Sequence, residues 1–173
     1  LLLFGQELNT ARRPAEARAL FLEFTRQFTN STLLPEVRMA MARTCEIEGD
    51  WPAAIAVYDD VLRLSPVPSV AVEAEFHRAL AFDQAGRDTN AFALMTNFLA
   101  RHVSSDLAPR AQDWLGDFHF RREEFIEAER RYQPLYENTN WVRSGLGFMA
   151  RLKAGRSAFM RENFNDATNY FLG

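Results

Sequence analysis

Apolar residues recur along the chain at helical spacing, in short runs that turn-forming residues interrupt. The clearest pair of runs extends from about Thr32 to Pro66, and Gly49-Asp50 separates its two halves. The two apolar faces consist of Val37, Met41, Ala42 and Cys45 in the first half, and of Ala54, Tyr58, Val61 and Leu62 in the second. This pattern predicts two amphipathic helices joined by a short turn.

A pair of apolar residues repeats with a fixed period. Alanines recur every 37 residues, then once after 39, and each is followed four residues later by a large apolar side chain. The pairs are Ala17 and Phe21, Ala54 and Tyr58, Ala91 and Met95, Ala128 and Tyr132, and Ala167 and Phe171. A small residue lets two helices cross at close range, and a fixed period of this length is typical of stacked repeats. We therefore expect an all-α solenoid of antiparallel helix pairs, with four to five repeats.

The same period places the unit boundaries and turns. As one solenoid over residues 1–173, the chain divides into units of roughly 1–31, 32–68, 69–105, 106–142 and 143–173. Turns within the units are expected near Arg12, Gly49, Gly86, Arg122 and Glu162. Thr32, Ser69 and Asp106 share the period and are expected N-caps, as is Asp50. Pro134 falls inside an expected helix, which should kink or end early there.

At this point the chain resembles the tetratricopeptide repeat (TPR) family, whose units carry Leu-Gly-x-x-Tyr in the first helix and Ala-x-x-x-Phe in the second. The first signature reads Met41-Ala42…Cys45 in one unit and Leu115-Gly116…His119 in another. The period is longer than the family's usual 34 residues, and the extra residues fall in the linkers Ser65–Ser69 and Val103–Asp106. That linker style resembles a bacterial cell-envelope subgroup, which includes the periplasmic Tol–Pal coordinator and the lipoprotein of the outer-membrane β-barrel assembly machine. The resemblance implies a non-enzymatic protein-binding scaffold, in the periplasm rather than the cytoplasm.

Composition restricts the classes of partner. The chain is 47% apolar and 25% charged, typical of a globular protein, and its apolar stretches are too short to span a bilayer. A net charge of −3 argues against nucleic-acid binding, and the single Cys45 excludes an internal disulfide. Because Leu1 lies inside an expected helix, we expect a segment of a longer protein.

No residue pattern points to catalysis, a metal or a cofactor. His77, His102 and His119 lie in three separate helices without ligand spacing, and His119 takes a position where the family usually buries a tyrosine. Asp59-Asp60 and Glu123-Glu124 are adjacent on helices, where neighbours point about 100° apart and do not converge on one substrate. We therefore expect no catalytic residue, metal ligand or cofactor in this chain.

The family resemblance maps a concave groove onto the first helix of each unit, where a protein or peptide would bind. The candidate groove residues are Met39, Arg43, Glu46, Phe76, Leu80, Asp83, Asp113, Asp117, Phe120, Leu152, Arg156 and Phe159. The family's lysine and asparagine carboxylate clamp has no match, because those positions hold Arg43, Leu80, Asp117 and Arg156. Phe76 and Phe120 are expected to be partly exposed and close together, as apolar anchors for a bound segment. The alternative is that the groove phenylalanines and leucines pack between repeats.

Two other functions are compatible with this pattern. The repeats could be a regulatory or targeting domain of a larger enzyme whose catalytic region lies outside this sequence. They could also form a helical repeat that reads RNA, which the acidic balance disfavours. The oligomeric state is not predicted.

Overall fold

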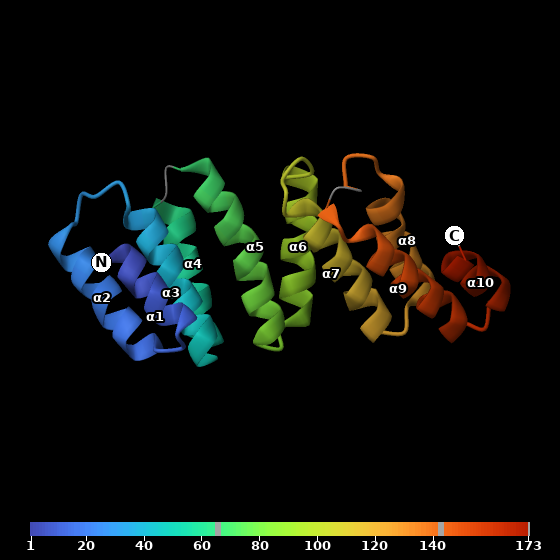
Figure 1. The fold of residues 1–173 in the computed structure, drawn as a ribbon, viewed down its shortest axis with the longest axis horizontal. Coiled ribbons are helices and arrows are strands. Elements are labelled where there is room, and N and C mark those ends of the chain that lie inside the picture. The colour runs from blue at the N-terminus through green and yellow to red at the C-terminus, as the bar shows by residue number, and fades with distance from the viewer. Residues whose placement is uncertain (65–66, 142–143, 173) are drawn as a thin grey trace. The chain divides into compact units, whose positions relative to one another are not determined.

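The computed structural model describes residues 1–64, 67–141 and 144–172. Within these residues the chain forms ten α-helices and no β-strand, which confirms the predicted all-α fold (Figure 1). The helices are α1 (Leu2–Thr10), α2 (Pro14–Gln27), α3 (Leu34–Glu48), α4 (Trp51–Leu64), α5 (Pro68–Gln84), α6 (Asp88–Arg101), α7 (Ala108–Arg121), α8 (Phe125–Glu137), α9 (Gly147–Met160) and α10 (Phe164–Leu172).

The turn inside each helix pair contains one residue in the left-handed backbone region. These residues are Arg12 (φ 54°), Gly49 (73°), Gly86 (71°), Glu123 (61°) and Glu162 (62°). Their spacing is 37 residues three times and then 39, the same as that of the paired alanines. A left-handed residue after a helix reverses the chain direction and is most easily supplied by glycine. The predicted turn positions are therefore confirmed, one of them shifted from Arg122 to Glu123.

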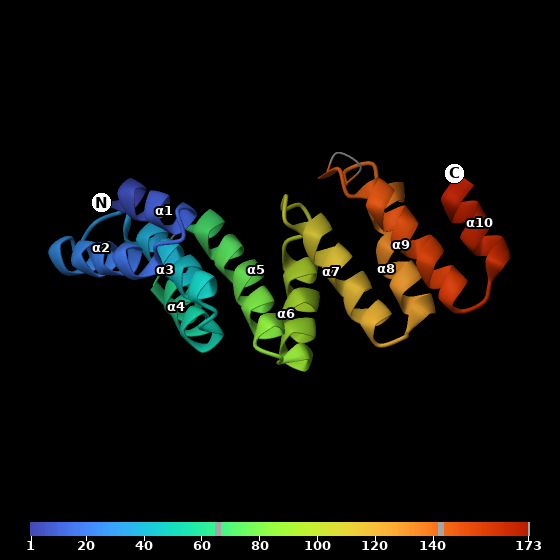
Figure 2. The ribbon, with the colours of Figure 1, turned by 60° about the horizontal axis from the view of Figure 1, so that its bottom comes forward.

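The chain divides into two compact units, Leu1–Leu94 and Met95–Gly173, with the boundary inside α6. In the first unit, α1, α3 and α5 contact one another in sequence and form one layer, while α2 and α4 contact that layer from the other side. In the second unit, α7, α8, α9 and α10 contact each other in chain order, as both views show (Figures 1 and 2). The division into five repeat units stays a prediction.

The periodic residues form the cores of both units. All five periodic alanines are buried, with exposed fractions of 0–3%. In the first unit, Phe21 is fully buried and packs with Ala17, Val37 and Ala40. In the second, Tyr132 packs with Ala128, and Ala150 and Ala154 of the following first helix join the same cluster. In these two clusters a second helix, α2 or α8, is thus covered by the first helix of the next pair, α3 or α9, which is how stacked repeats share a continuous core.

The expected caps at Thr32, Ser69 and Asp106 are wrong. The residues before α3, α5 and α7 are Leu33, Val67 and Leu107, and none has a side-chain cap hydrogen bond. At α3 and α7, a serine two residues before Leu33 or Leu107 accepts a backbone hydrogen bond close to the start of the helix. The backbone N–H groups of Leu33 and Leu107 donate to Oγ of Ser31 and Ser105, both at 3.2 Å. A serine hydroxyl that accepts a nearby backbone N–H forms a local turn, and this turn moves the helix start beyond the expected cap.

The Asp50 cap is confirmed, because its Oδ1 accepts the N–H of Ala53 at 3.1 Å. The early end expected at Pro134 is wrong. Helix α8 continues to Glu137, and the carbonyl oxygen of Pro134 accepts the N–H of Asn138 at 3.0 Å. A proline removes only its own backbone donor, so the residues after it can still complete the helix. Ser65 and Pro66, which carry part of the linker pattern, lie outside the described residues.

Candidate functional site

A pocket of about 390 Å³ lies on the first-helix layer of the first unit. We call it the α1–α3–α5 pocket after the helices that line it. Its lining residues are Gln6, Asn9 and Thr10 of α1, Glu36, Met39, Ala40, Arg43 and Ile47 of α3, and Val70 and Glu73 of α5. The α3 residues form one stripe because they are spaced three or four positions apart, which places them on a single helical face.

Three polar contacts fix the walls of this pocket. The Asn9 amide donates to the carbonyl oxygen of Ala40 at 3.3 Å and accepts the hydroxyl of Thr44 at 3.1 Å. Across the pocket, the guanidinium of Arg43 on α3 pairs with the carboxylate of Glu73 on α5. All three first helices are therefore connected by polar side chains at the pocket surface.

Beside the pocket, Glu46 contacts two neighbouring helices. The hydroxyl of Tyr58 on α4 donates to Oε1 of Glu46 at 2.8 Å, and Nδ1 of His77 on α5 lies 4.0 Å from the same oxygen. Burial raises the pKa of the Glu46 carboxyl, and the Tyr58 hydrogen bond opposes that rise. Burial and the negative charge of Glu46 likewise raise the pKa of Tyr58.

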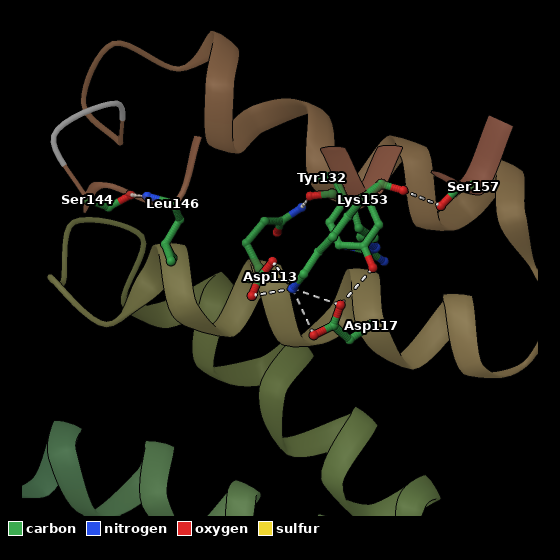
Figure 3. Close-up of polar contacts among 9 residues, drawn as sticks. Asp113, Asp117, Tyr132, Ser144, Leu146, Lys153 and Ser157 are labelled. Carbon is green, nitrogen blue, oxygen red and sulfur yellow. Dashed lines mark hydrogen bonds and ion pairs between the residues drawn. The ribbon is translucent and has the colours of Figure 1, made fainter. Parts of the chain in front are cut away.

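The second unit has a tighter cluster of charges (Figure 3). Nζ of Lys153 on α9 lies 2.8 Å from both carboxylate oxygens of Asp113 and 3.0 Å from Oδ2 of Asp117, both on α7. The hydroxyl of Tyr132 on α8 donates to Oδ1 of Asp117 at 2.8 Å. Burial raises the pKa of Asp113, although Lys153 opposes the rise. Burial would lower the pKa of Lys153, but the two carboxylates outweigh it, so this pKa is raised.

Aromatic side chains extend this cluster along α9. The guanidinium carbon of Arg156 lies 4.9 Å from the ring centre of Phe120, a cation–π distance. Phe120 packs edge-on against Phe125 at 5.5 Å between ring centres, and Phe159 packs in the same way against Phe164. Phe159 and Phe164 are 55% and 57% exposed. A small pocket of about 80 Å³ lies among Asp117, Phe120, Tyr132, Lys153 and Arg156.

The predicted groove residues separate into three groups. Met39 and Arg43 line the α1–α3–α5 pocket, although the Met39 side chain is largely buried. Asp113, Asp117, Phe120 and Arg156 come together around Lys153, with Phe159 exposed further along α9. Glu46 contacts Tyr58, and the half-buried Leu80 and Asp83 lie on α5. Partial exposure is confirmed for Phe120 and wrong for Phe76, which is only 2% exposed.

Phe76 is buried because the helical face that carries it packs inside the unit rather than facing outward. Its neighbours on α5, Ala74 and Ala79, are fully buried as well. Packing in the core, the alternative given above for the groove phenylalanines, therefore holds for Phe76. His119, expected to be a packed core histidine, is also buried at 8% exposure, with Nδ1 2.6 Å from Oε2 of Glu124.

Sequence reasoning missed three important surface residues, Asn9, Glu73 and Lys153. Each is a polar residue on a first helix whose partner lies on the neighbouring first helix, 30–40 residues away. The period offers one usable signal. Lys153 of α9 and His77 of α5 occupy equivalent positions in their repeats. Each faces a carboxylate on the preceding first helix, Asp113 of α7 for Lys153 and Glu46 of α3 for His77.

A further pocket of about 510 Å³ lies in the second unit, where the loop before α7 approaches the segment after α8. Its lining includes Ser105, Asp106, Asn138, Asn140 and Trp141. Across the described residues, no group of three or more histidines, cysteines and acidic residues is arranged to hold a metal ion. None of the helices in the described ranges combines the length and the apolar character needed to cross a membrane.

Comparison with known proteins identifies the repeat. The tetratricopeptide repeat model matches residues 2–67 and 47–96. No curated protein matches the chain. Among solved structures, the chain is similar to BtubC from P. vanneervenii, with a TM-score of 0.77, 13% identity and coverage of 95% of this chain and 73% of that one.

Two other solved structures are similar at comparable levels. MamA from Desulfovibrio magneticus RS-1 gives a TM-score of 0.71 at 19% identity, with coverage of 97% of this chain and 87% of that one. A tetratricopeptide repeat protein from Parabacteroides merdae gives 0.74 at 16% identity, with coverage of 98% and 62%. Identities this low establish the fold alone. Because the two family matches together span more than half of the 173 residues, the chain belongs to the tetratricopeptide repeat family.

Proposed function

We propose that the protein is a scaffold that binds a segment of another protein in the α1–α3–α5 pocket. Repeats of this family typically act as protein-interaction scaffolds, which bind partners on extended helical surfaces. The observation that carries the proposal is the pocket itself, because it is hollowed into the first-helix layer and lined by both apolar and polar side chains. Sites that combine apolar surface with a few fixed polar groups are typical of ligand and peptide recognition.

The dimensions of the pocket favour a short peptide segment. The lining stripe on α3 runs from Glu36 to Ile47, which at the helical rise is about 16 Å. An extended chain covers that length with about five residues. Ile47 is 39% exposed at one end of the stripe and offers an apolar contact. The pocket therefore suits one or two anchoring side chains of a bound segment.

We further propose that this scaffold works in a bacterial envelope assembly, in the periplasm. The support is the linker style of Val103–Asp106 and of the residues around Ser69, which resembles envelope members of the family. Fractionation of cells that produce the full-length protein tests this setting. Recovery in the periplasmic or membrane fraction is expected, and recovery with cytosolic markers would reject it.

Binding in the pocket is tested by site-specific crosslinking in living cells. A photoreactive amino acid replaces Ile47 in the pocket or, as the control, Leu22 on α2, which is 51% exposed and outside the pocket. A discrete crosslinked partner is expected from position 47 and not from position 22. The purified partner should then bind the Ile47→Asn variant more weakly than the Leu22→Asn variant. Equal crosslinking from both positions, or none from position 47, would contradict the proposal.

A further inference from the structure

Glu36 lines the α1–α3–α5 pocket with a carboxylate that has no partner. Its Oε2 atom is shielded from solvent, and no hydrogen bond or ion pair reaches Glu36 from the described residues. A buried acceptor that loses water without gaining a donor raises the free energy of the protein. A ligand that supplies a donor at this point would remove that cost.

Of the other polar side chains that line the pocket, those of Arg43, Glu73, Asn9 and Thr10 already have partners, and that of Gln6 carries no charge. Arg43 pairs with Glu73 on the opposite wall. Both ends of the Asn9 amide are used, and the hydroxyl of Thr10 donates to the carbonyl oxygen of Gln6. Because Glu36, Arg43 and Glu73 are the charged residues lining the pocket and two of them pair, no cationic side chain of the lining is left to pair with Glu36.

The apolar part of the lining restricts which donor fits. Met39, Ala40, Ile47 and Val70 line the same pocket as Glu36. Lysine and arginine side chains place their methylene groups along apolar surface and their charged ends at polar groups. An acidic side chain would face Glu36 with like charge, and a neutral apolar side chain would leave Oε2 without a donor. A cationic side chain meets both requirements.

We infer that the α1–α3–α5 pocket selects a partner segment that carries a lysine or arginine, whose charged end binds Glu36. This inference rests on the proposed function of the pocket and adds the chemical class of its partner. The apolar lining contacts the methylene groups of that side chain, and the Arg43–Glu73 pair borders it. The specificity is therefore opposite in charge to that of the family's carboxylate clamp, whose lysine and asparagine pattern this chain lacks.

Hexapeptide libraries test the inference on the 173-residue chain. One position is fixed as arginine, lysine, norleucine or glutamate, and the other positions are mixtures, so that no single flanking sequence decides the outcome. Binding is followed by the backbone amide NMR signals of α1, α3 and α5 during titration at one salt concentration. The arginine and lysine libraries are expected to bind about tenfold more tightly than the norleucine library, and the glutamate library more weakly still.

A matched pair of variants assigns the effect to Glu36. Glu36→Gln keeps the size of the side chain and removes its charge, and should weaken the cationic libraries about tenfold while leaving norleucine unchanged. Glu7→Gln, an exposed carboxylate on α1 outside the pocket lining, should leave every library unchanged. Equal affinity of cationic and norleucine libraries, or no effect of Glu36→Gln, would overturn the inference and leave the proposed function standing. If no library shifts the pocket amides, both are rejected.

Discussion

The ring of Tyr132 lies directly against the backbone of Gly116. A Cβ atom built on Gly116 would lie 2.8 Å from Cζ of Tyr132 and closer still to two other ring carbons. Gly5 and Phe21, and Gly155 and Phe171, have the same relationship at the equivalent positions. Glycine in the first helix therefore lets an aromatic ring of the second helix approach its backbone, which is the close packing that the repeat signature encodes.

Two repeats have alanine at this position, Ala42 and Ala79, and the first of them shows a different arrangement. There Ala42 takes the place of Gly116, and Tyr58 takes that of Tyr132. The Tyr58 hydroxyl binds Glu46, four residues after Ala42, whereas the Tyr132 hydroxyl binds Asp117, the residue directly after Gly116. The repeat with Ala42 at the contact thus pairs its tyrosine with Glu46, and the repeat with Gly116 pairs its tyrosine with Asp117.

Gly116→Ala should destabilise the protein by about 1–2 kcal/mol. Alanine favours the helix by about 1 kcal/mol, but the added methyl group overlaps the Tyr132 ring, and overpacking of a filled core costs about 1–3 kcal/mol. The hydrogen bond to Asp117 would also be disturbed. Urea unfolding measures the change. In a Tyr132→Leu background the same substitution should be neutral or stabilising, and an equal loss in both backgrounds would show that the ring contact is not the cause.

Glu123→Gly should stabilise the protein by on the order of 0.5–1 kcal/mol. Glu123 has a φ of 61°, which costs a residue with a side chain about 1–2 kcal/mol, and part of this gain is lost to the greater freedom of glycine in the unfolded chain. The reverse change, Gly86→Ala at φ 71°, should destabilise by about 1 kcal/mol, although nothing lies within 4 Å of the added methyl group. Melting temperatures that move in the same direction for both variants would contradict this explanation.

Ala128→Leu should destabilise by about 1–3 kcal/mol, because Ala128 is fully buried in the cluster with Tyr132 and Ala154. Arg130→Leu on the same helix is the control, since the Arg130 side chain is 68% exposed and pairs with Glu127, three residues away on the same helix. Denaturation curves should separate the two variants clearly. Equal stability would mean that the periodic alanine does not mark the helix crossing.

Lys153→Met should destabilise by about 1–3 kcal/mol at neutral pH, because it removes the cation that pairs with the largely buried Asp113 and with its neighbour Asp117. The double variant Asp113→Asn, Lys153→Met should recover part of this loss. Unfolding by urea at pH 7 compares the three proteins. If the double variant is as unstable as the single one, the unpaired carboxylate is not the source of the loss.

The pH dependence of the Lys153→Met variant has a defined sign. Burial already raises the pKa of Asp113 above 3.8, and loss of the lysine raises it further. When the pKa of a carboxyl is higher in the folded protein than in the unfolded chain, protonation of that carboxyl favours folding. This contribution to stability is fully present at pH values below the unfolded pKa and is lost as the pH rises through the folded pKa. The stability deficit of the variant should therefore shrink as pH falls from 7 toward the unfolded value. A deficit that is constant over this range would contradict the assignment.

The sequence by itself determined the all-α repeat, its period and the positions of its turns. Paired residues such as Ala17 and Phe21 repeat with the same spacing as the left-handed residues Gly49 and Gly86. These features depend on interactions between residues close in the chain: helical spacing, backbone angles and the need for a small side chain at each crossing. Short-range requirements of this kind leave a direct trace in the order of residues.

Only the tertiary structure decided which first-helix residues reach the surface and which meet across helices. Phe76 and Phe120 have the same expected role in the sequence, yet Phe76 is buried and Phe120 stacks with Arg156. Lys153 joins Asp113 from 40 residues away. Neighbouring helical positions differ by about 100° in direction, so a small rotation of one helix against the next exchanges buried and exposed side chains. That rotation is set by the packing of whole helices, which no local pattern specifies.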